Sequence, residues 1–287
     1  MPIRTAAIAA ALAGFVFVQP VLAEDCPGNP DALGVARTVE IDTTGGPGFG
    51  LEQYKLYDFL QAGEVVLTFD DGPWPDNTAK VLKALKDHCV KATFFAIGKH
   101  AVWHPHILKQ VAAAGHTIGT HTFSHANLAK GKMKGEPGRE EIEKGLSAVK
   151  FALGAAPAPF FRFPALQDPD DFVSYVGSRN LAIFSMDVDS FDFKTRDPSK
   201  VVKTVMAKIT KKGKGIILMH DFQKATANGL PELLNELKKN GFKVVHLTPK
   251  HSAVSIETYD EAIKKEFAGP MADARPMSSV VKTITGQ

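Results

Sequence analysis

The stretch Glu64–Trp74 reads EVVLTFDDGPW and decides how the rest of the chain is interpreted. Its first half is an apolar run rich in β-forming residues, which is typical of a strand covered on both faces of a parallel sheet. The run ends at two adjacent carboxylates, Asp70 and Asp71, followed by Gly72. In α/β folds, ligands and catalytic groups gather at the carboxyl ends of the strands. Asp-Gly-Pro is also ordinary turn chemistry, so the stretch alone leaves both interpretations open.

After residue 64, segments with strand character and segments with helix character alternate regularly along the chain. The expected strands are 65–69, 92–97, 116–119, 160–163, 182–186, 215–219 and 243–247, and the expected helices are 77–88, 105–114, 139–153, 170–178, 198–210, 230–240 and 257–267. Alternation of this kind predicts an α/β fold with a parallel sheet flanked by helices. Seven strands in one domain favour a distorted, closed or nearly closed (β/α) barrel, with an open doubly wound sheet as the alternative.

The first 23 residues have the pattern of a cleaved secretory signal peptide. Arg4 supplies a positive charge, residues 6–18 are apolar, and the stretch ending at Ala23 suits a signal peptidase. The apolar stretch is short of the roughly 20 residues needed to span a bilayer. We therefore expect export to a periplasm or to the medium, with no stable membrane insertion after cleavage.

The remaining chain divides into an N-terminal arm (24–63) with a short strand near residues 37–41, a main domain (64–250) and a tail (251–287). The two cysteines, Cys26 and Cys89, could pair in an oxidising compartment and pin the arm to the end of the first helix, but the sequence leaves this open. A net charge of +3 with scattered Lys and Arg gives no indication of a nucleic-acid surface. The oligomeric state is also left open.

Nearly every expected strand is followed by a reactive side chain, and in a parallel barrel these would meet at one end. His121 and His125 are spaced i, i+4, which on a helical turn places both imidazoles on one side. Asp71 is the natural third ligand. Two imidazoles and one carboxylate with open positions describe a catalytic divalent metal site, with zinc as the first choice and cobalt or nickel as alternatives.

The neighbouring polar residues suggest how such a site could move protons. Asp70 could act as general base, with Arg162 orienting it. His220, at the end of the sixth strand, could act as general acid, with Asp189 as its carboxylate partner. For Arg162 and Asp189 a purely structural ion pair is nearly as good an explanation.

Five short patterns in this chain, taken together, resemble the motifs of the polysaccharide deacetylases, called carbohydrate esterase family four, which share the nodulation-type chitooligosaccharide deacetylase homology domain. They are Thr68-Phe69-Asp70-Asp71-Gly72, His121-x-x-Ser124-His125, Arg162-x-Pro164, Asp189-x-x-Asp192 and Leu218-x-His220. The resemblance implies a distorted (β/α) barrel and a hydrolase that cleaves linear amides, removing acetyl groups from N-acetylglucosamine units of chitooligosaccharides or peptidoglycan. It also implies the metal, base, acid and orienting roles given above, each for the same residue.

Four residues are candidates for contacts with the substrate, on less specific signals than those for the metal ligands. The resemblance implies that Leu218 lines a pocket for the acetyl methyl group and that Pro164 of the third motif also contacts the substrate. Trp74 and Phe191 could stack on sugar rings, although buried aromatic residues are common in barrels.

This chain departs from the family pattern at two places, with Ala165-Leu166 after the third motif and Phe193 where a tryptophan is common. Both changes bear on substrate preference more than on activity. An O-acetyl ester hydrolase acting on xylan-type polysaccharide and an inactive glycan-binding homologue are the alternative functions.

Overall fold

Strand β3 (Glu64–Asp70) is the central strand of the sheet, and all seven of its residues are buried. The computed structural model describes residue 26 and residues 29–267, so the expected signal peptide and the end of the tail lie outside the described residues. β3 pairs in parallel with β4 (Thr93–Ala96) on one side and β9 (Gly215–His220) on the other. Burial on both faces explains why apolar residues occupy positions 65, 66, 67 and 69 without alternating with exposed polar ones.

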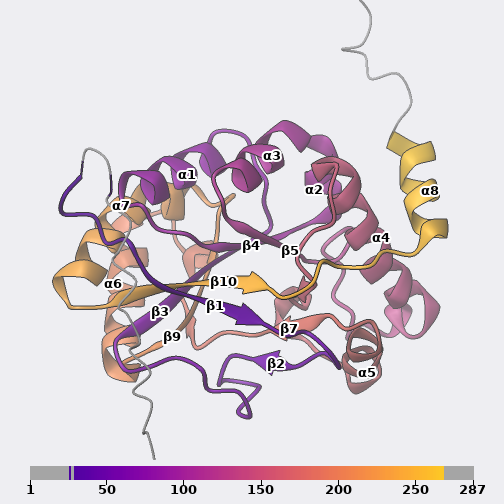
Figure 1. Cartoon of the computed structure of the whole chain (residues 1–287), viewed down its shortest axis with the longest axis horizontal. Helices are drawn as coiled ribbons and strands as arrows, with labels where there is room; N and C mark the ends of the chain where they lie inside the picture. Colours follow the sequence, from indigo (N-terminus) through magenta and orange to yellow (C-terminus); the bar gives the residue numbers. More distant parts are fainter. Residues whose placement is uncertain (1–25, 27–28, 268–287) are drawn as a thin grey trace, which may run out of the picture.

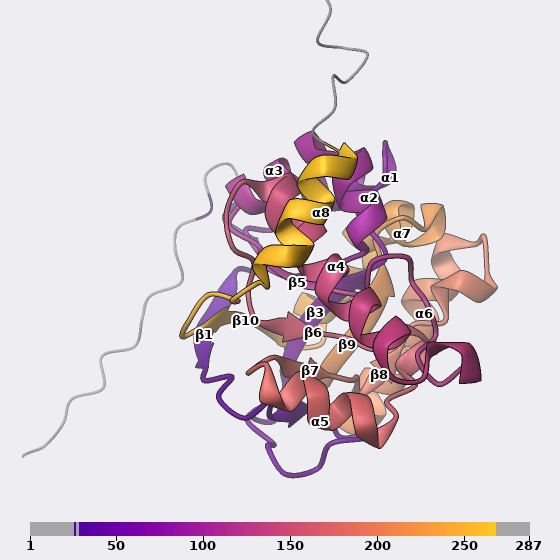
Figure 2. The same cartoon turned by 90° about the vertical axis from the view of Figure 1, so that its right-hand side faces the viewer.

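Parallel pairing continues from β3 through most of the sheet. Seven strands follow one another in the order β8-β9-β3-β4-β5-β6-β7. The members not yet described are β5 (Thr117–Thr120), β6 (Phe160–Phe161), β7 (Ala182–Phe184) and β8 (Val188–Asp189). Among the described residues no ladder joins β7 to β8, so the ring of strands is interrupted there. The predicted α/β fold with a parallel sheet is confirmed, and helices pack around the outside of the sheet (Figures 1 and 2).

The seventh expected strand has a different place from the one expected. β10 (Lys243–Pro249) pairs along most of its length with β1 (Val35–Ile41), which belongs to the N-terminal arm, and it reaches β3 only at Glu64 and Val65. From Thr68 onward β3 pairs with β4, so β10 diverges from the barrel there. The two-residue strand β8 takes the seventh position in the ring instead. A second arm strand, β2 (Gly48–Phe49), extends the sheet beside β7.

The helices follow the expected order, with α1 (Asn77–Asp87), α3 (Pro105–Ala113), α4 (Glu136–Leu153), α5 (Asp170–Ser178), α6 (Pro198–Lys212), α7 (Lys224–Lys239) and α8 (Glu257–Phe267). Two differences matter for the site. The short helix α2 (Gly98–Trp103) was not predicted. Helix α7 begins six residues earlier than expected, and its first turn is held by a hydrogen bond that Thr226 donates to Asp192 and by the burial of Ala225 and Ala227. The helix continues through Pro231. No described helix is long and apolar enough to cross a membrane.

Two imidazoles outside the motifs lie on or beside the strands: His116 is buried and His246 is half-buried. The Nδ1 atom of His116 accepts a hydrogen bond of 3.2 Å from the backbone N–H of Ala92. Burial and the nearby Lys91 lower the pKa of His116 to about 3. Burial also lowers the pKa of His246 to about 4. Both rings are therefore neutral at pH 7.

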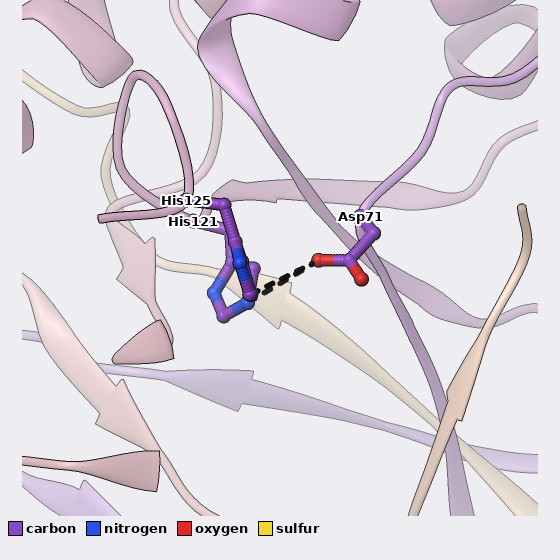
Figure 3. Close-up of side chains that lie close together, drawn as sticks. All are labelled: Asp71, His121 and His125. Carbon is purple, nitrogen blue, oxygen red and sulfur yellow. Dashed lines mark ion pairs between the residues drawn. The ribbon is translucent and has the colours of Figure 1, made fainter. Parts of the chain in front are cut away.

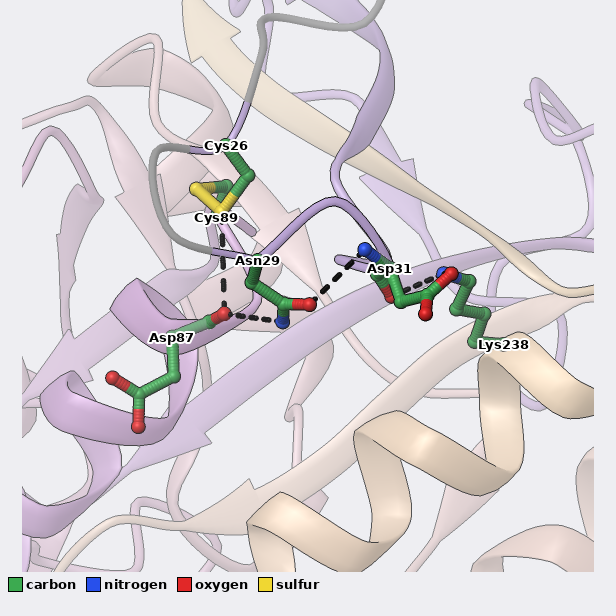
Figure 4. The surroundings of a disulfide bond; sticks show 6 residues. All are labelled: Cys26, Asn29, Asp31, Asp87, Cys89 and Lys238. Carbon is green, nitrogen blue, oxygen red and sulfur yellow. Dashed lines mark hydrogen bonds and ion pairs between the residues drawn. A yellow bond between two sulfur atoms is a disulfide. The ribbon is translucent and has the colours of Figure 1, made fainter.

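A disulfide joins Cys26 to Cys89, with 5.7 Å between the two Cα atoms (Figure 4). It links the N-terminal arm to the end of α1, so the pairing left open by the sequence is present in the structure. Asn29 of the arm donates a 2.8 Å hydrogen bond to the carbonyl of Asp87, and Lys238 on α7 approaches Asp31. The arm is thus held against two helices of the main domain.

Candidate active site

One cavity of about 390 Å³ lies at the carboxyl ends of the parallel strands, where the sequence predicted the reactive groups to meet. Its wall contains Asp70, Asp71, His121, His125, Phe163, Ala165, Leu166, Asp189, Phe193, Leu218, His220 and Phe222. These residues come from five different strand ends. The cavity therefore combines a cluster of titratable groups with apolar walls, which is the usual make-up of a small-molecule site.

Asp71, His121 and His125 form a group able to hold a metal ion, with their donor atoms within 4.8 Å of one another (Figure 3). Asp71 Oδ1 lies 3.6 Å from Nε2 of His121 and 3.4 Å from Nε2 of His125. For ligand bonds of about 2.0–2.2 Å, tetrahedral coordination spaces ligands by about 3.3–3.6 Å, so these separations suit one ion. Among the described atoms, Asp71 Oδ1 is buried and has no hydrogen-bond partner, which a cation would supply.

Neighbouring groups fix the orientation of His121. Its Nδ1 atom donates a 2.7 Å hydrogen bond to the carbonyl of Arg162, which leaves Nε2 facing Asp71. Burial lowers the pKa of His121 despite the two nearby carboxylates, and the neutral imidazole is the form that binds metals.

Two of the three members of this cluster have an unusual backbone. Asp71 and His125 lie in the left-handed region, with φ angles of 74° and 59°. Residues with a side chain rarely adopt this conformation, and it is concentrated at functional sites. The adjacent Gly72 is required for a different reason, since a Cβ there would lie 2.2 Å from the carboxylate of the buried Asp221. Burial raises the pKa of Asp221 to about 7.

Asp70 lies between this group and a buried guanidinium. Arg162 donates a 2.7 Å hydrogen bond to Oδ1 of Asp70, and both side chains are almost completely buried. The remaining donors of Arg162 bond to Thr68 Oγ1 and to the carbonyls of Phe184 and Ser185. Because these bonds hold the guanidinium in one position, it orients Asp70 and compensates its charge. Oδ2 of Asp70 lies on the metal side, 3.9 Å from His121 Nε2.

The partner of His220 differs from the predicted one. The Nδ1 atom of His220 donates a 2.7 Å hydrogen bond to Oδ1 of Asp192, and the His220 backbone N–H donates to Oδ2 of the same residue. The prediction that Asp189 is the direct partner was wrong. Asp189 lines the cavity, but its Oδ1 accepts a hydrogen bond from the backbone N–H of Phe191.

The two aspartates differ because β8 ends at Asp189 and the chain turns at Phe191, which has a φ of 52°. This turn brings the Asp192 carboxylate within hydrogen-bond distance of Nδ1 of His220. Burial lowers the pKa of His220, but the hydrogen bond and charge of Asp192, with Asp70 and Asp71, outweigh it and raise the pKa to about 9.

The expected substrate contacts are only partly at the cavity. Leu218 lines it. Pro164 is buried, and the flanking Phe163, Ala165 and Leu166 line the wall in its place. Trp74 packs its ring edge to face against His100 and lies outside the lining. Phe191 also lies outside it, and the ammonium groups of Lys194 and Lys208 are 4.1 and 3.8 Å from the centre of its ring.

Sequence reasoning missed three contributors to the site. Asp192 was quoted as part of a motif without a role. Phe222 lines the cavity two residues after His220, and Phe193, noted only as a departure, packs edge to face against the His220 ring at 5.7 Å. Aromatic residues within four positions of a predicted catalytic residue were the available signal for Phe193 and Phe222.

Comparison with known proteins agrees with this geometry. The polysaccharide deacetylase family model matches residues 60–182. A chitooligosaccharide deacetylase from Sinorhizobium fredii is 30% identical over 207 residues, which cover 66% of this chain and 93% of that protein. The chain belongs to the polysaccharide deacetylase family.

Two further relatives are named for peptidoglycan. A peptidoglycan-N-acetylglucosamine deacetylase from Bacillus cereus is 34% identical over 188 residues, covering 64% of this chain and 66% of that protein. The solved structure of a Bdellovibrio bacteriovorus peptidoglycan deacetylase matches with a TM-score of 0.65 and 33% identity, covering 75% of this chain and 59% of that one. The chain thus spans less than two thirds of the length of each of these two relatives.

Proposed function

We propose that this protein removes N-acetyl groups from N-acetylglucosamine-containing glycans of the chitooligosaccharide or peptidoglycan type. The observation that carries the proposal is the division of labour between Asp70 and Asp71. Asp70 accepts a hydrogen bond from Arg162. Asp71 Oδ1 lies 3.6 Å from Nε2 of His121 and 3.4 Å from Nε2 of His125. An adjacent base and metal ligand, with His220 on the other side of the cavity, supply what amide hydrolysis requires.

In the proposed reaction, water adds to the acetyl carbonyl carbon and Asp70 takes the proton that this water loses. His220 then gives a proton to the amide nitrogen as the C–N bond breaks, which leaves acetate and a free amine. The raised pKa of about 9 keeps His220 protonated at pH 7, as a general acid must be. Leu218 and Phe222 form the apolar wall against which an acetyl methyl group would rest.

A divalent cation, which we propose to be zinc, would be held by Asp71, His121 and His125 and would supply Lewis-acid polarisation of the carbonyl and acidification of water. The chain's own residues do the rest: Arg162 holds Asp70 in place, and Asp192 holds His220. The proposed export to a periplasm or to the medium is supported by the Cys26–Cys89 disulfide, because such bonds persist in oxidising compartments.

The test is acetate release from N-acetylated chitooligosaccharides, peptidoglycan and acetylated xylan by the purified protein, before and after exhaustive chelation. We expect release from the first two substrates, its loss on chelation, and recovery when zinc, cobalt or nickel is added back. Full activity after chelation contradicts the role of the metal. Release from acetylated xylan alone would favour the O-acetyl ester alternative, and turnover of none of them would favour a glycan-binding homologue.

A further inference from the structure

A second hollow, of about 320 Å³, lies beside the proposed reaction centre. It is lined by Asp71, Ile97, Lys99, His100, Trp103, Ser124, His125 and Phe222. Three of these residues, Asp71, His125 and Phe222, also line the main cavity. The two spaces therefore adjoin across the metal-binding group, so a chain of sugars with one acetylated unit in the main cavity has room for a neighbouring unit here.

The walls of this hollow are tied to the metal-binding segments. The backbone N–H groups of Gly98 and Lys99 donate hydrogen bonds of 2.9 and 2.8 Å to the carbonyls of Thr122 and Phe123. These carbonyls belong to the loop between His121 and His125. The ring of His100 bonds through Nδ1 to the carbonyl of Asp71 at 2.6 Å. Helix α2 therefore keeps a fixed position relative to the reaction centre, as a specificity-determining wall must.

Trp103 gives the hollow an apolar platform. Its side chain is 55% exposed, which is unusual for tryptophan, and its ring lies 5.6 Å from the ring of His100. An exposed aromatic face beside a cavity is suited to stacking on the apolar face of a sugar ring. The ring of Trp74 packs edge to face against His100, 5.0 Å between the ring centres.

Lys99 gives the hollow a positive charge. In the part of the chain that the structure describes, its ammonium group has no carboxylate within 4.0 Å and lies 5.5 Å from the centre of the Phe123 ring. The carboxylate of Glu141 is already bonded to the backbone and hydroxyl of Ser124. Asp71, the carboxylate among the residues that line the hollow, faces the two imidazoles. Lys99 is thus the cation available to a ligand in this space.

We propose that this hollow binds a sugar bearing a carboxylate next to the acetylglucosamine unit that is deacetylated, with Trp103 under the ring and Lys99 paired with the carboxylate. This inference rests on the proposed function and selects among its substrates. In peptidoglycan the sugar beside each N-acetylglucosamine carries a lactyl ether whose carboxyl group is either free or linked to a peptide that bears carboxylates of its own, whereas every unit of a chitooligosaccharide is neutral. The charge complementarity therefore favours the peptidoglycan type.

The experiment compares two tetrasaccharides of equal length that differ in the carboxylates. One is the neutral tetramer of N-acetylglucosamine, and the other alternates N-acetylglucosamine with N-acetylmuramic acid. Acetate release gives kcat/KM for each, and calorimetry gives Kd for each on an Asp70→Asn background, in which the glycan is not turned over. The variants are Lys99→Gln, Lys99→Arg and Trp103→Ala, with Lys203→Gln on the exposed surface of α6 as the matched control.

We expect Lys99→Gln to lower the preference for the anionic tetrasaccharide, as a ratio of kcat/KM or of Kd values, by about tenfold, the range of a partly exposed charged hydrogen bond. Lys99→Arg should retain most of the preference, and added salt should weaken it in the wild type. Trp103→Ala should weaken binding of both tetrasaccharides. Lys203→Gln should change neither.

An unchanged ratio in Lys99→Gln, or no preference for the anionic tetrasaccharide in the wild type, overturns the inference while leaving the deacetylase proposal intact. Absence of acetate release from both tetrasaccharides counts against the proposed function. In that case the binding ratio on the Asp70→Asn background still decides whether the hollow selects a carboxylate.

Discussion

Replacing Asp192 with Asn tests the hydrogen-bonded pair that Asp192 forms with His220, the proposed general acid. Asp192 bonds to both the ring and the backbone of His220, and it is the main reason that the pKa of His220 rises to about 9 against the effect of burial. Relative to an ordinary histidine value of about 6.5, a shift of this size corresponds to about 3 kcal/mol in favour of the imidazolium. Without that charge, burial should carry the pKa of His220 below 7 and leave most of the acid deprotonated at neutral pH.

We expect Asp192→Asn to lower kcat on an N-acetylated chitooligosaccharide by about a hundredfold, which is within the range for loss of general acid catalysis. Because the acid must be protonated, activity should fall as pH rises through the pKa of His220, and in the variant this alkaline limb should move to lower pH. The matched control is Asp189→Asn, in which the amide oxygen can still accept from Phe191, and its kcat should fall less than about tenfold.

Metal content and the thermal midpoint are measured alongside the rates, because Asp192 is completely buried and also accepts a hydrogen bond from Thr226. A general loss of structure would lower activity at every pH without moving the alkaline limb. The reasoning is refuted if the limb stays in place in Asp192→Asn, or if Asp189→Asn is the variant that moves it.

Three further changes test other parts of the structure. Asp71→Asn should lower zinc affinity by about tenfold or more, while Asp70→Asn should keep the metal and lose turnover; equal metal loss in both, measured by metal analysis after dialysis, would mean that the two roles are misassigned. Replacing Cys26 and Cys89 together with Ser removes a cross-link across a sequence separation of 63 residues and should lower the free energy of unfolding in urea by about 4 kcal/mol by the loop-entropy estimate; no change would show that the arm is held by its other contacts. The pKa of His116 is lowered to about 3 in the folded state, so protonation favours the unfolded chain as pH falls below about 6.5, and the stabilisation lost between pH 7 and pH 5 should be about 2 kcal/mol. His116→Asn, which keeps an acceptor but cannot be protonated, should show a correspondingly smaller loss in urea titrations at the two pH values, and an identical loss would contradict the assignment.

The sequence by itself determined the sheet and the identity of the reactive groups. A mainly apolar run such as residues 65–69 indicates a buried strand or helix, and its length and flanking turn select the strand. The regular alternation then makes the sheet parallel, which sends Asp71, His121 and His220 to one end of it. That convergence needs no knowledge of side-chain packing, because it follows from strand direction alone.

Tertiary structure decided which neighbouring side chains act together. Asp189 and Asp192 both follow one strand, and only the turn at Phe191 determines that the second reaches His220. The same holds for β10. Sequence periodicity predicts this strand, but only the tertiary structure shows that it pairs with β3 no further than Val65 and that β4 takes its place from Thr68. The hollow lined by Trp103 depends on helix α2, which the sequence did not predict. Periodicity reports whether a residue is buried, whereas partners are chosen by contacts between residues far apart in sequence, which no local pattern contains.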